Sequence, residues 1–179
     1  MAKQVIRKLQ LRSPAFSPGE RIPRRHARAP EGLDASPALT WALVPGEARE
    51  LVLVCDDPDA PSAEPWVHWV VYRIGSTLKG LPEGVPKDER PGNPEGMIQG
   101  LNSWGEVGYG GPQPPVGHGT HHYRFRLYAI DTNLTLGPGA SKAEVLETID
   151  GHVVGEGELV GTYERLAGPA TGGAPDEVV

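Results

Sequence analysis

Four polar side chains of this 179-residue chain stand at the ends of apolar, strand-like segments, where they could act together on a small ligand. Asp57 follows one apolar run and His68 lies within a second, while His121 and Tyr123 begin a third. Carboxylate, imidazole and phenol groups supply hydrogen-bond donors and acceptors, and an imidazole can become positively charged near neutral pH. These residue types predict a binding site, provided that the three segments meet at one end of a sheet.

The strand that carries His121 and Tyr123 follows a loop rich in glycine and proline. Glycine lets the backbone approach a ligand closely and proline fixes φ, so the first half of Gly108–Asp131 is expected to be a shaped loop. In the second half, period-two alternation predicts one core-facing side, formed by His121, Tyr123, Phe125, Leu127 and Ala129. The opposite side contains His122, Arg124, Arg126 and Tyr128, and the first three of these are predicted to face solvent.

Three aspartates lie where the apolar run 51–55 ends, and they need separate interpretations. Asp57 continues the face of Leu51, and a carboxylate at the exit of a buried strand requires a compensating partner. We therefore predict that Asp57 points toward His121. For Asp56 and Asp59, which belong to the Asp- and Pro-rich segment DDPDAP, turn formation is the favoured interpretation.

His68 has two interpretations. Alone among tryptophans and valines, it is more typical of a hydrogen-bonded core histidine than of a ligand-binding residue. The company of two other inward polar groups, Asp57 and His121, favours the binding interpretation. Alternation across 66–74 predicts one face that holds Trp66, His68, Val70 and Tyr72.

The rest of the chain is typical of one turn-rich globular domain. Glycine and proline number 24 and 19, and the apolar runs are long enough to build a core over residues 1–167. A Gly/Pro/acidic tail, 168–179, is expected to be disordered. Net charge is −6, which argues against non-specific binding to nucleic acid or membranes. The single cysteine, the lack of an apolar leader and the lack of a membrane span predict a soluble, cytoplasmic protein.

Several strands and one helix are expected. Strand patterns cover 5–11, a segment ending near Val44, 51–57, 66–74, 122–131 and a short last segment, 159–165. A capping box, Ser141 to Glu144, predicts a helix that ends or frays near Gly151, with an apolar stripe that could resume through Val153 and Val154. The connection 75–100 is long and rich in turn formers. This order favours a mainly β sandwich with a peripheral helix near the C-terminus.

Three separated motifs carry a resemblance to a known family. The segments DDPDAP, WVHW and GYGGPQPPVGHGTHHYRF, in this order, resemble the phosphatidylethanolamine-binding protein family, and most closely its bacterial and archaeal Raf-kinase-inhibitor-like branch. The resemblance spans nearly the whole chain. It implies a large central antiparallel sheet, a smaller sheet beside it, and a pocket at one end that binds phosphate or phosphorylated head groups.

The resemblance also assigns residues to that pocket. Asp57 and Asp59 match the two aspartates of the first motif, His68 the histidine of the second, and His121 and Tyr123 the His-x-Tyr of the third. Pro114 and Pro115 match the prolines of the glycine-rich turn. Two positions depart from the pattern. Gln113 stands where bacterial members often carry cysteine, and His122 stands where arginine is usual, which removes a fixed positive charge.

These assignments predict how the pocket would hold an anion. His68 and His121 would donate N–H groups and become cationic near neutral pH, with Asp57 holding one imidazole. Backbone amides around Gly110, Gly111 and Gly117 would add donors, as in other anion-binding loops. Because Asp57 repels an anion, bare phosphate should bind weakly, and more tightly as pH falls through the histidine titration.

Three other functions were considered. A zinc hydrolase could draw its ligands from Asp57, His68, His118, His121 and His122. However, His121 and His122 are adjacent on a strand, point in opposite directions and cannot share an ion, and His118 is expected to be a solvated loop residue. A papain-like peptidase, suggested by Asn102-Ser103-Trp104, lacks a nucleophile at a helix start, so this segment is interpreted as a turn and wall beside the pocket. The open alternative is a kinase or protease inhibitor that acts through a surface interface and recognises a phosphorylated partner.

The sequence thus predicts a regulatory ligand-binding protein. No cofactor, metal or catalysis is expected, and relatives that form dimers leave a homodimer open.

Overall fold

A computed structural model describes residues 4–168, and the predicted tail lies outside this range except for Gly168. The described part of the chain is mainly β, as predicted. Its strands are β1 (Arg7–Lys8), β2 (Gln10–Arg12), β3 (Leu39–Ala42), β4 (Glu50–Asp57), β5 (Trp66–Gly75), β6 (Gly80–Leu81), β7 (Ile98–Gln99), β8 (His121–Ile130) and β9 (Val153–Tyr163). A short 3-10 helix, η1 (Arg24–His26), and one α-helix, α1 (Lys142–Ile149), complete the described elements.

The strands form two sheets. The large sheet has the order β1-β9-β8-β4-β5-β7 and the small sheet the order β2-β3-β6. All pairings in the large sheet are antiparallel except that of β1 with β9, so this sheet is mixed rather than purely antiparallel. The expected first strand is divided at Leu9, because β1 joins the large sheet and β2 joins the small one.

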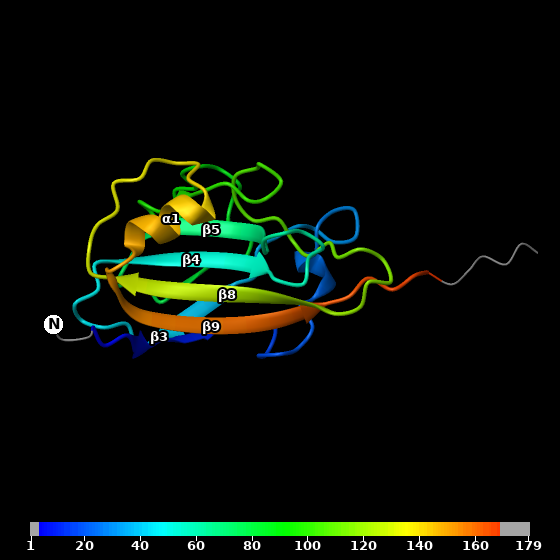
Figure 1. Ribbon diagram of the computed structural model, residues 1–179, viewed down its shortest axis with the longest axis horizontal. Coiled ribbons are helices and arrows are strands. Elements are labelled where there is room, and N and C mark those ends of the chain that lie inside the picture. The colour runs from blue at the N-terminus through cyan, green and yellow to red at the C-terminus, as the bar shows by residue number, and fades with distance from the viewer. Residues whose placement is uncertain (1–3, 169–179) are drawn as a thin grey trace, which may run out of the picture.

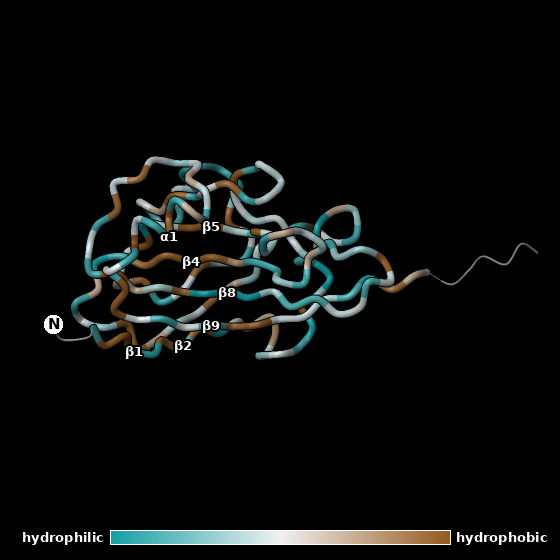
Figure 2. The backbone as a smooth tube through the Cα atoms, in the orientation of Figure 1, coloured by the Kyte–Doolittle hydropathy of each residue, from teal (hydrophilic) through white to brown (hydrophobic). Residues whose placement is uncertain are grey.

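The inner strand β4 is apolar on both faces because each face covers a separate core. Figure 2 shows hydrophobic colour along much of β4, whereas its neighbour β8 is more hydrophilic. Leu51, Leu53 and Cys55 belong to the core between the two sheets. Val52 and Val54 belong to a second core on the opposite face, under α1. Burial of these side chains is the main stabilising contribution to the sheet.

Helix α1 begins as the sequence predicts. The Ser141 hydroxyl accepts a hydrogen bond from the Glu144 amide, and the Glu144 carboxylate accepts one from the Ser141 amide. Val145 and Ile149 are buried against the second core, and Figure 1 shows α1 beside β5 and β4. After Gly151 the chain does not resume the helix. It continues directly into β9, which is therefore six residues longer at its start than the predicted segment 159–165.

Asp56 was interpreted as a turn residue, and this interpretation is wrong. Its side chain, on β4 beside Arg124 of β8, is fully buried. It accepts hydrogen bonds from Arg124 at 2.9 Å, Arg126 at 2.9 Å and Lys142 at 2.6 Å. Burial alone would raise the pKa of Asp56, but the bonds from Lys142 and Arg124 outweigh it and hold the pKa below its ordinary value. The side of β8 that carries Arg124 and Arg126 is thus partly exposed to solvent and also forms an ion-pair cluster with Asp56.

The topology brings three strand ends together. β4 runs antiparallel to both β5 and β8, so the end of β4 lies beside the starts of the other two, at the right of Figure 1. Asp57 is the last residue of β4 and pairs with Trp66, the first residue of β5. His121 is the first residue of β8. The long connection 75–100 contains β6, which pairs with β3 in the small sheet, and β7, which pairs with the other side of β5. No helix of the described residues has the length and apolar character that crossing a membrane requires.

Candidate functional site

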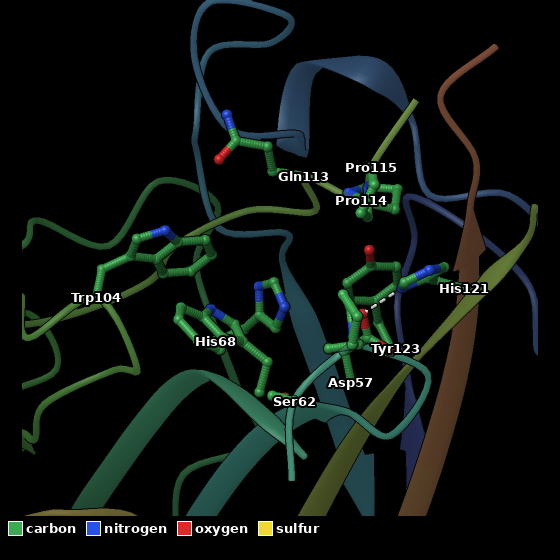
Figure 3. A pocket seen from close by; sticks show the side chains of 12 residues that line it. Asp57, Ser62, His68, Trp104, Gln113, Pro114, Pro115, His121 and Tyr123 are labelled. Atoms are coloured by element: carbon green, nitrogen blue, oxygen red, sulfur yellow. Dashed lines mark hydrogen bonds and ion pairs between the residues drawn. The ribbon is translucent and has the colours of Figure 1, made fainter. Parts of the chain in front are cut away.

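A cavity of about 230 Å³ opens where these strand ends meet. Figure 3 shows the side chains around it, which come from the end of β4, the start of β5, the start of β8 and the loops before them. Its lining consists of Asp57, Ala60, Pro61, Ser62, Trp66, His68, Trp104, Gln113, Pro114, Pro115, His121 and Tyr123. Six of the eight residues predicted for the site are in this lining, whereas Asp59 and Gly111 are not.

Asp57 and His121 form a buried, hydrogen-bonded pair at one side of the cavity. The His121 Nδ1–H donates to Asp57 Oδ2 at 2.7 Å, and both side chains are almost fully buried. The second oxygen of the carboxylate, Oδ1, accepts from the Asp59 amide at 2.8 Å. The prediction that Asp57 points toward His121 is confirmed. The charge of Asp57 is compensated by these donors, which lowers its repulsion of an anion in the cavity.

His118 is part of the same chain of hydrogen bonds. It was expected to be a solvated loop residue, but its Nδ1 lies 2.6 Å from His121 Nε2. With the His121 proton on Nδ1, Nε2 of that ring accepts from the His118 Nδ1–H. Both nitrogens of His121 are therefore engaged, and His121 cannot also donate to a ligand as the sequence analysis assumed.

His68 reaches the cavity because β5 contains a bulge. Cys55 pairs with Trp69, and Asp56 pairs with Val67, so His68 is an extra residue opposite β4. A bulge breaks strict alternation and redirects side chains. His68 consequently faces the cavity and the core between the sheets, whereas Val70 lies in the opposite core. The prediction that these two residues share a face is wrong, although the predicted meeting of His68 with Asp57 and His121 is observed.

The ring of His68 is held in one tautomer. Its Nδ1–H donates to the Gly110 carbonyl at 2.6 Å, and the Gly110 amide donates back to the His68 carbonyl at 2.9 Å. Burial lowers the pKa of His68 to about 4, although the Gly110 hydrogen bond and Asp57 favour the charged form. His68 is therefore neutral at pH 7, and the expectation that it would be cationic is wrong. Its Nε2 is left as a hydrogen-bond acceptor.

The low pKa of His68 predicts loss of stability in acid. Its pKa is about 4 in the folded protein and 6.5 ordinarily, so between these values the unfolded chain binds more protons and stability falls as pH falls. The full effect is about 3 kcal/mol. We expect urea denaturation to show that the free energy of unfolding falls by about 2–3 kcal/mol more in wild type than in His68→Gln between about pH 7.5 and pH 4.5. Equal losses would contradict a neutral, buried His68.

Two residues that line the cavity carry buried donors without a partner within residues 4–168. These donors are the hydroxyl of Tyr123 and Nε1–H of Trp66. Burial, with a further effect of Asp57, raises the pKa of Tyr123, so its hydroxyl keeps its proton and can donate. Leaving a buried donor unsatisfied costs about 1–3 kcal/mol. A ligand with acceptor atoms would remove this cost.

The glycine-loop amides are not free to bind an anion. The Gly110 amide donates to His68, the Gly111 amide to Asp34 Oδ1 at 2.7 Å, and the Gly117 amide to the Arg165 carbonyl. Gly111 is instead required for close packing, because a Cβ atom there would lie 2.2 Å from the His26 carbonyl oxygen. The prediction that these amides form an anion-binding loop is wrong.

This close contact predicts the effect of Gly111→Ala. The backbone at His26 would have to move, and we expect the free energy of unfolding to fall by about 1–3 kcal/mol. Gly46→Ala is the matched control, because nothing lies within 4 Å of a Cβ atom at that position. Urea denaturation of both variants measures the difference, and equal stabilities would show that the loop adjusts freely.

Asp59 stabilises the rim of the site from outside the cavity. Its Oδ2 accepts from both the backbone amide and Nδ1 of His122 at 2.8 Å. Burial alone would raise the pKa of Asp59, but these bonds outweigh it and hold the pKa below its ordinary value. His122 thus points outward, opposite to His121, as predicted. The histidine that stands here in place of the usual arginine therefore binds Asp59.

Aromatic and proline side chains form the walls. The ring of His68 packs edge-on against Trp104 and Tyr123, with centroids 5.2 and 5.0 Å apart. The Asn102 side chain accepts from the Trp104 amide, so the segment 102–104 is the turn and wall that the sequence predicts. The sequence did not predict Trp66 and Gln113 as site residues. Alternation gave a usable signal for Trp66, which shares a face with His68.

The geometry gives little support to a zinc hydrolase or a cysteine peptidase. Within residues 4–168 no three His, Cys, Asp or Glu side chains are grouped so that they could hold a metal ion. Cys55 is buried, and burial, with the nearby carboxylates of Asp56 and Asp57, raises the pKa of its thiol well above its ordinary value. A protonated, buried thiol is a poor nucleophile.

Comparisons with known proteins agree with the fold and the motifs. The family model of phosphatidylethanolamine-binding protein matches residues 12–164. A UPF0098 protein of Methanothermobacter thermautotrophicus is 50% identical over 157 residues, which cover 88% of this chain and 99% of the relative. A UPF0098 protein of Pyrococcus abyssi is 43% identical over 153 residues, which cover 86% of this chain and 84% of the relative.

Solved structures give the same result. E. coli YbcL, described as a member of the mammalian PEBP family, has a TM-score of 0.81 and 33% identity, covering 87% of this chain and 98% of that one. A PEBP homologue from Chlamydia trachomatis has a TM-score of 0.77 and 38% identity, covering 91% and 99%. The chain therefore belongs to the phosphatidylethanolamine-binding protein family, in its bacterial and archaeal branch.

Proposed function

We propose that this protein is a non-catalytic ligand-binding protein whose cavity holds phosphate or a phosphorylated group. Family membership supports ligand binding as the general function. The observation that carries the finer proposal is the pair of buried, unpartnered donors on Tyr123 and Trp66 in the cavity lining. Buried donors without a partner are best satisfied by the acceptor oxygens of an oxyanion.

The surroundings of these donors agree with a small head group. A cavity of about 230 Å³ holds a phosphate-sized group, so the remainder of a larger ligand would lie outside it. The proline and aromatic walls are rigid, which lowers the entropic cost of binding. No Lys or Arg is among the lining residues, so binding of bare phosphate is expected to be weak.

Calorimetric titration with inorganic phosphate tests the proposal. Tyr123→Phe removes one donor, and we expect the affinity to fall about tenfold or more, because a hydrogen bond to a charged group contributes about 1.5–3 kcal/mol. Tyr128→Phe is the matched control, since Tyr128 lies on the same strand in the opposite core. Equal phosphate affinities of the two variants would place the anion elsewhere, and no binding by wild type would refute the proposal.

A phospholipid head group and a phosphorylated protein residue present the same chemistry to the cavity. Two probes separate these sources: phosphoethanolamine and a phosphoserine peptide, each compared with inorganic phosphate. Tighter binding of the first would indicate a lipid head group. Tighter binding of the second would indicate a phosphorylated partner such as a kinase or protease, the alternative that the sequence left open.

A further inference from the structure

The residues that line the cavity carry both unpartnered hydrogen-bond donors and an acceptor. Tyr123 and Trp66 contribute two buried donors that lack partners within residues 4–168. His68 contributes an acceptor, because the proton of its neutral ring is on Nδ1 and donates to Gly110. A ligand group that satisfies all three must accept at two of its atoms and donate at a third.

The charges around the cavity add a second requirement. The lining contains one carboxylate, Asp57, and no Lys or Arg. Both nitrogens of His121 are engaged by Asp57 and His118, so this ring offers no further donor. A doubly charged anion would lose its hydration here without a fixed cation to replace it, which costs more than burying a singly charged group.

We propose that the ligand group is an oxyacid that carries one proton, namely the monoanion of a phosphomonoester or phosphonate. This inference rests on the proposed function and specifies its ligand. The O–H of the monoanion donates to His68 Nε2, and two other oxygens accept from Tyr123 and Trp66. His68 is then the residue that determines specificity, because it selects a ligand with a proton to donate.

The groups that face His68 indicate that this proton arrives with the ligand. Burial lowers the pKa of His68 to about 4, although the Gly110 carbonyl and the carboxylates of Asp57 and Asp56 on β4 all favour its charged form. Near neutral pH the free imidazole therefore carries no extra proton to offer. Its Nε2 is ready to accept one in a hydrogen bond.

The remaining neighbours of His68 do not supply a proton either. Tyr123 on β8 and Trp104 in the loop pack edge-on against the ring. Cys55 on β4 borders a narrow space beneath it. Burial raises the pKa values of Cys55 and Tyr123, so both groups keep their own protons at neutral pH. The state of the ligand itself then controls binding.

Methyl phosphate and methyl sulfate form a matched pair for the test on the wild-type protein. As monoanions they have the same charge and nearly the same shape, and only methyl phosphate has an O–H. In titration calorimetry at about pH 5.5, we expect the affinity for methyl phosphate to exceed that for methyl sulfate by about tenfold or more. The affinity for methyl phosphate should fall about 20- to 30-fold by about pH 7.5, because its second pKa is about 6. Methyl sulfate should remain weak and unchanged.

Three results would overturn the inference while leaving the proposed function intact. They are equal affinities for the two esters, a methyl phosphate affinity that does not fall with rising pH, and a methyl sulfate affinity that rises in parallel as pH falls. The last result would place the proton on His68. Failure of both esters and of inorganic phosphate to bind at any pH would instead refute the proposed function.

A variant checks that His68 is the source of the selectivity. His68→Phe keeps an aromatic ring without an acceptor, and we expect the affinity ratio of methyl phosphate to methyl sulfate to fall to about one. His152→Ala should keep the wild-type ratio, because His152 is exposed and bonds only to Asp131 among the described residues. A wild-type ratio in His68→Phe would contradict the assignment of the acceptor.

Discussion

Replacing Asp56 by alanine is expected to lower the free energy of unfolding by about 3–5 kcal/mol, the largest effect of any substitution considered. The side chain is fully buried and accepts hydrogen bonds from Arg124, Arg126 and Lys142. Its removal would leave three partly buried cations without their shared carboxylate. It would also disconnect the start of α1 from β4 and β8. Urea denaturation at neutral pH measures the loss.

Asp131→Ala is the control for this prediction. Asp131 also forms an ion pair, with His152 at 2.9 Å, but both side chains are largely exposed. An exposed pair contributes at most about 1 kcal/mol, so this variant should be nearly as stable as wild type. A loss below about 1 kcal/mol in Asp56→Ala would show that solvent stabilises the three cations as well as the carboxylate does.

The second large effect is expected for ligand binding. The double substitution His68→Leu with Tyr123→Phe removes one acceptor and one donor from the cavity while leaving apolar walls. Each bond to a charged ligand contributes about 1.5–3 kcal/mol, so the affinity for inorganic phosphate should fall at least about 100-fold. Titration calorimetry at about pH 6, with denaturation curves to confirm folding, measures this.

The matched control is the double variant His152→Ala with Tyr128→Phe, which changes the same residue types away from the cavity. It should bind phosphate as wild type does. A folded His68/Tyr123 variant that retains wild-type affinity would mean that neither side chain contacts the anion.

The sequence predicted those features that depend on local periodicity. The two-sided apolar run of β4 and the capping box at Ser141 both specify their elements without reference to the rest of the chain. Alternation likewise placed Asp57 and His121 on inward faces. Because antiparallel strands bring their opposite ends together, these faces were sufficient to predict that the two side chains meet.

Features that depend on distant pairing were not predictable. The bulge at His68 belongs to the pairing of β5 with β4, in which Cys55 pairs with Trp69 and Asp56 with Val67, and nothing in the segment WVHW requires it. Asp56 beside Asp57 and Pro58 has the local sequence of a turn. Only its contacts with β8 and α1, 68 or more residues away, reveal a buried ion-pair cluster.

The chemistry of the site was the least predictable part. Residue types suggested cationic histidines and free glycine amides, whereas both depend on partners that the sequence does not specify. The Gly110 carbonyl fixes the proton of His68, and Asp34, 77 residues before Gly111, occupies the amide of that glycine. The observed cavity therefore combines neutral donors with an acceptor where the sequence suggested positive charge.

Nitrogen NMR of the His68 ring during a phosphate titration at neutral pH distinguishes an acceptor His68 from a cationic one. We expect a neutral ring protonated at Nδ1 in the free protein, with an Nε2 signal that shifts in a saturable manner as phosphate is added. An imidazolium in the free protein, or an Nε2 signal that does not respond while phosphate binds, would contradict this expectation.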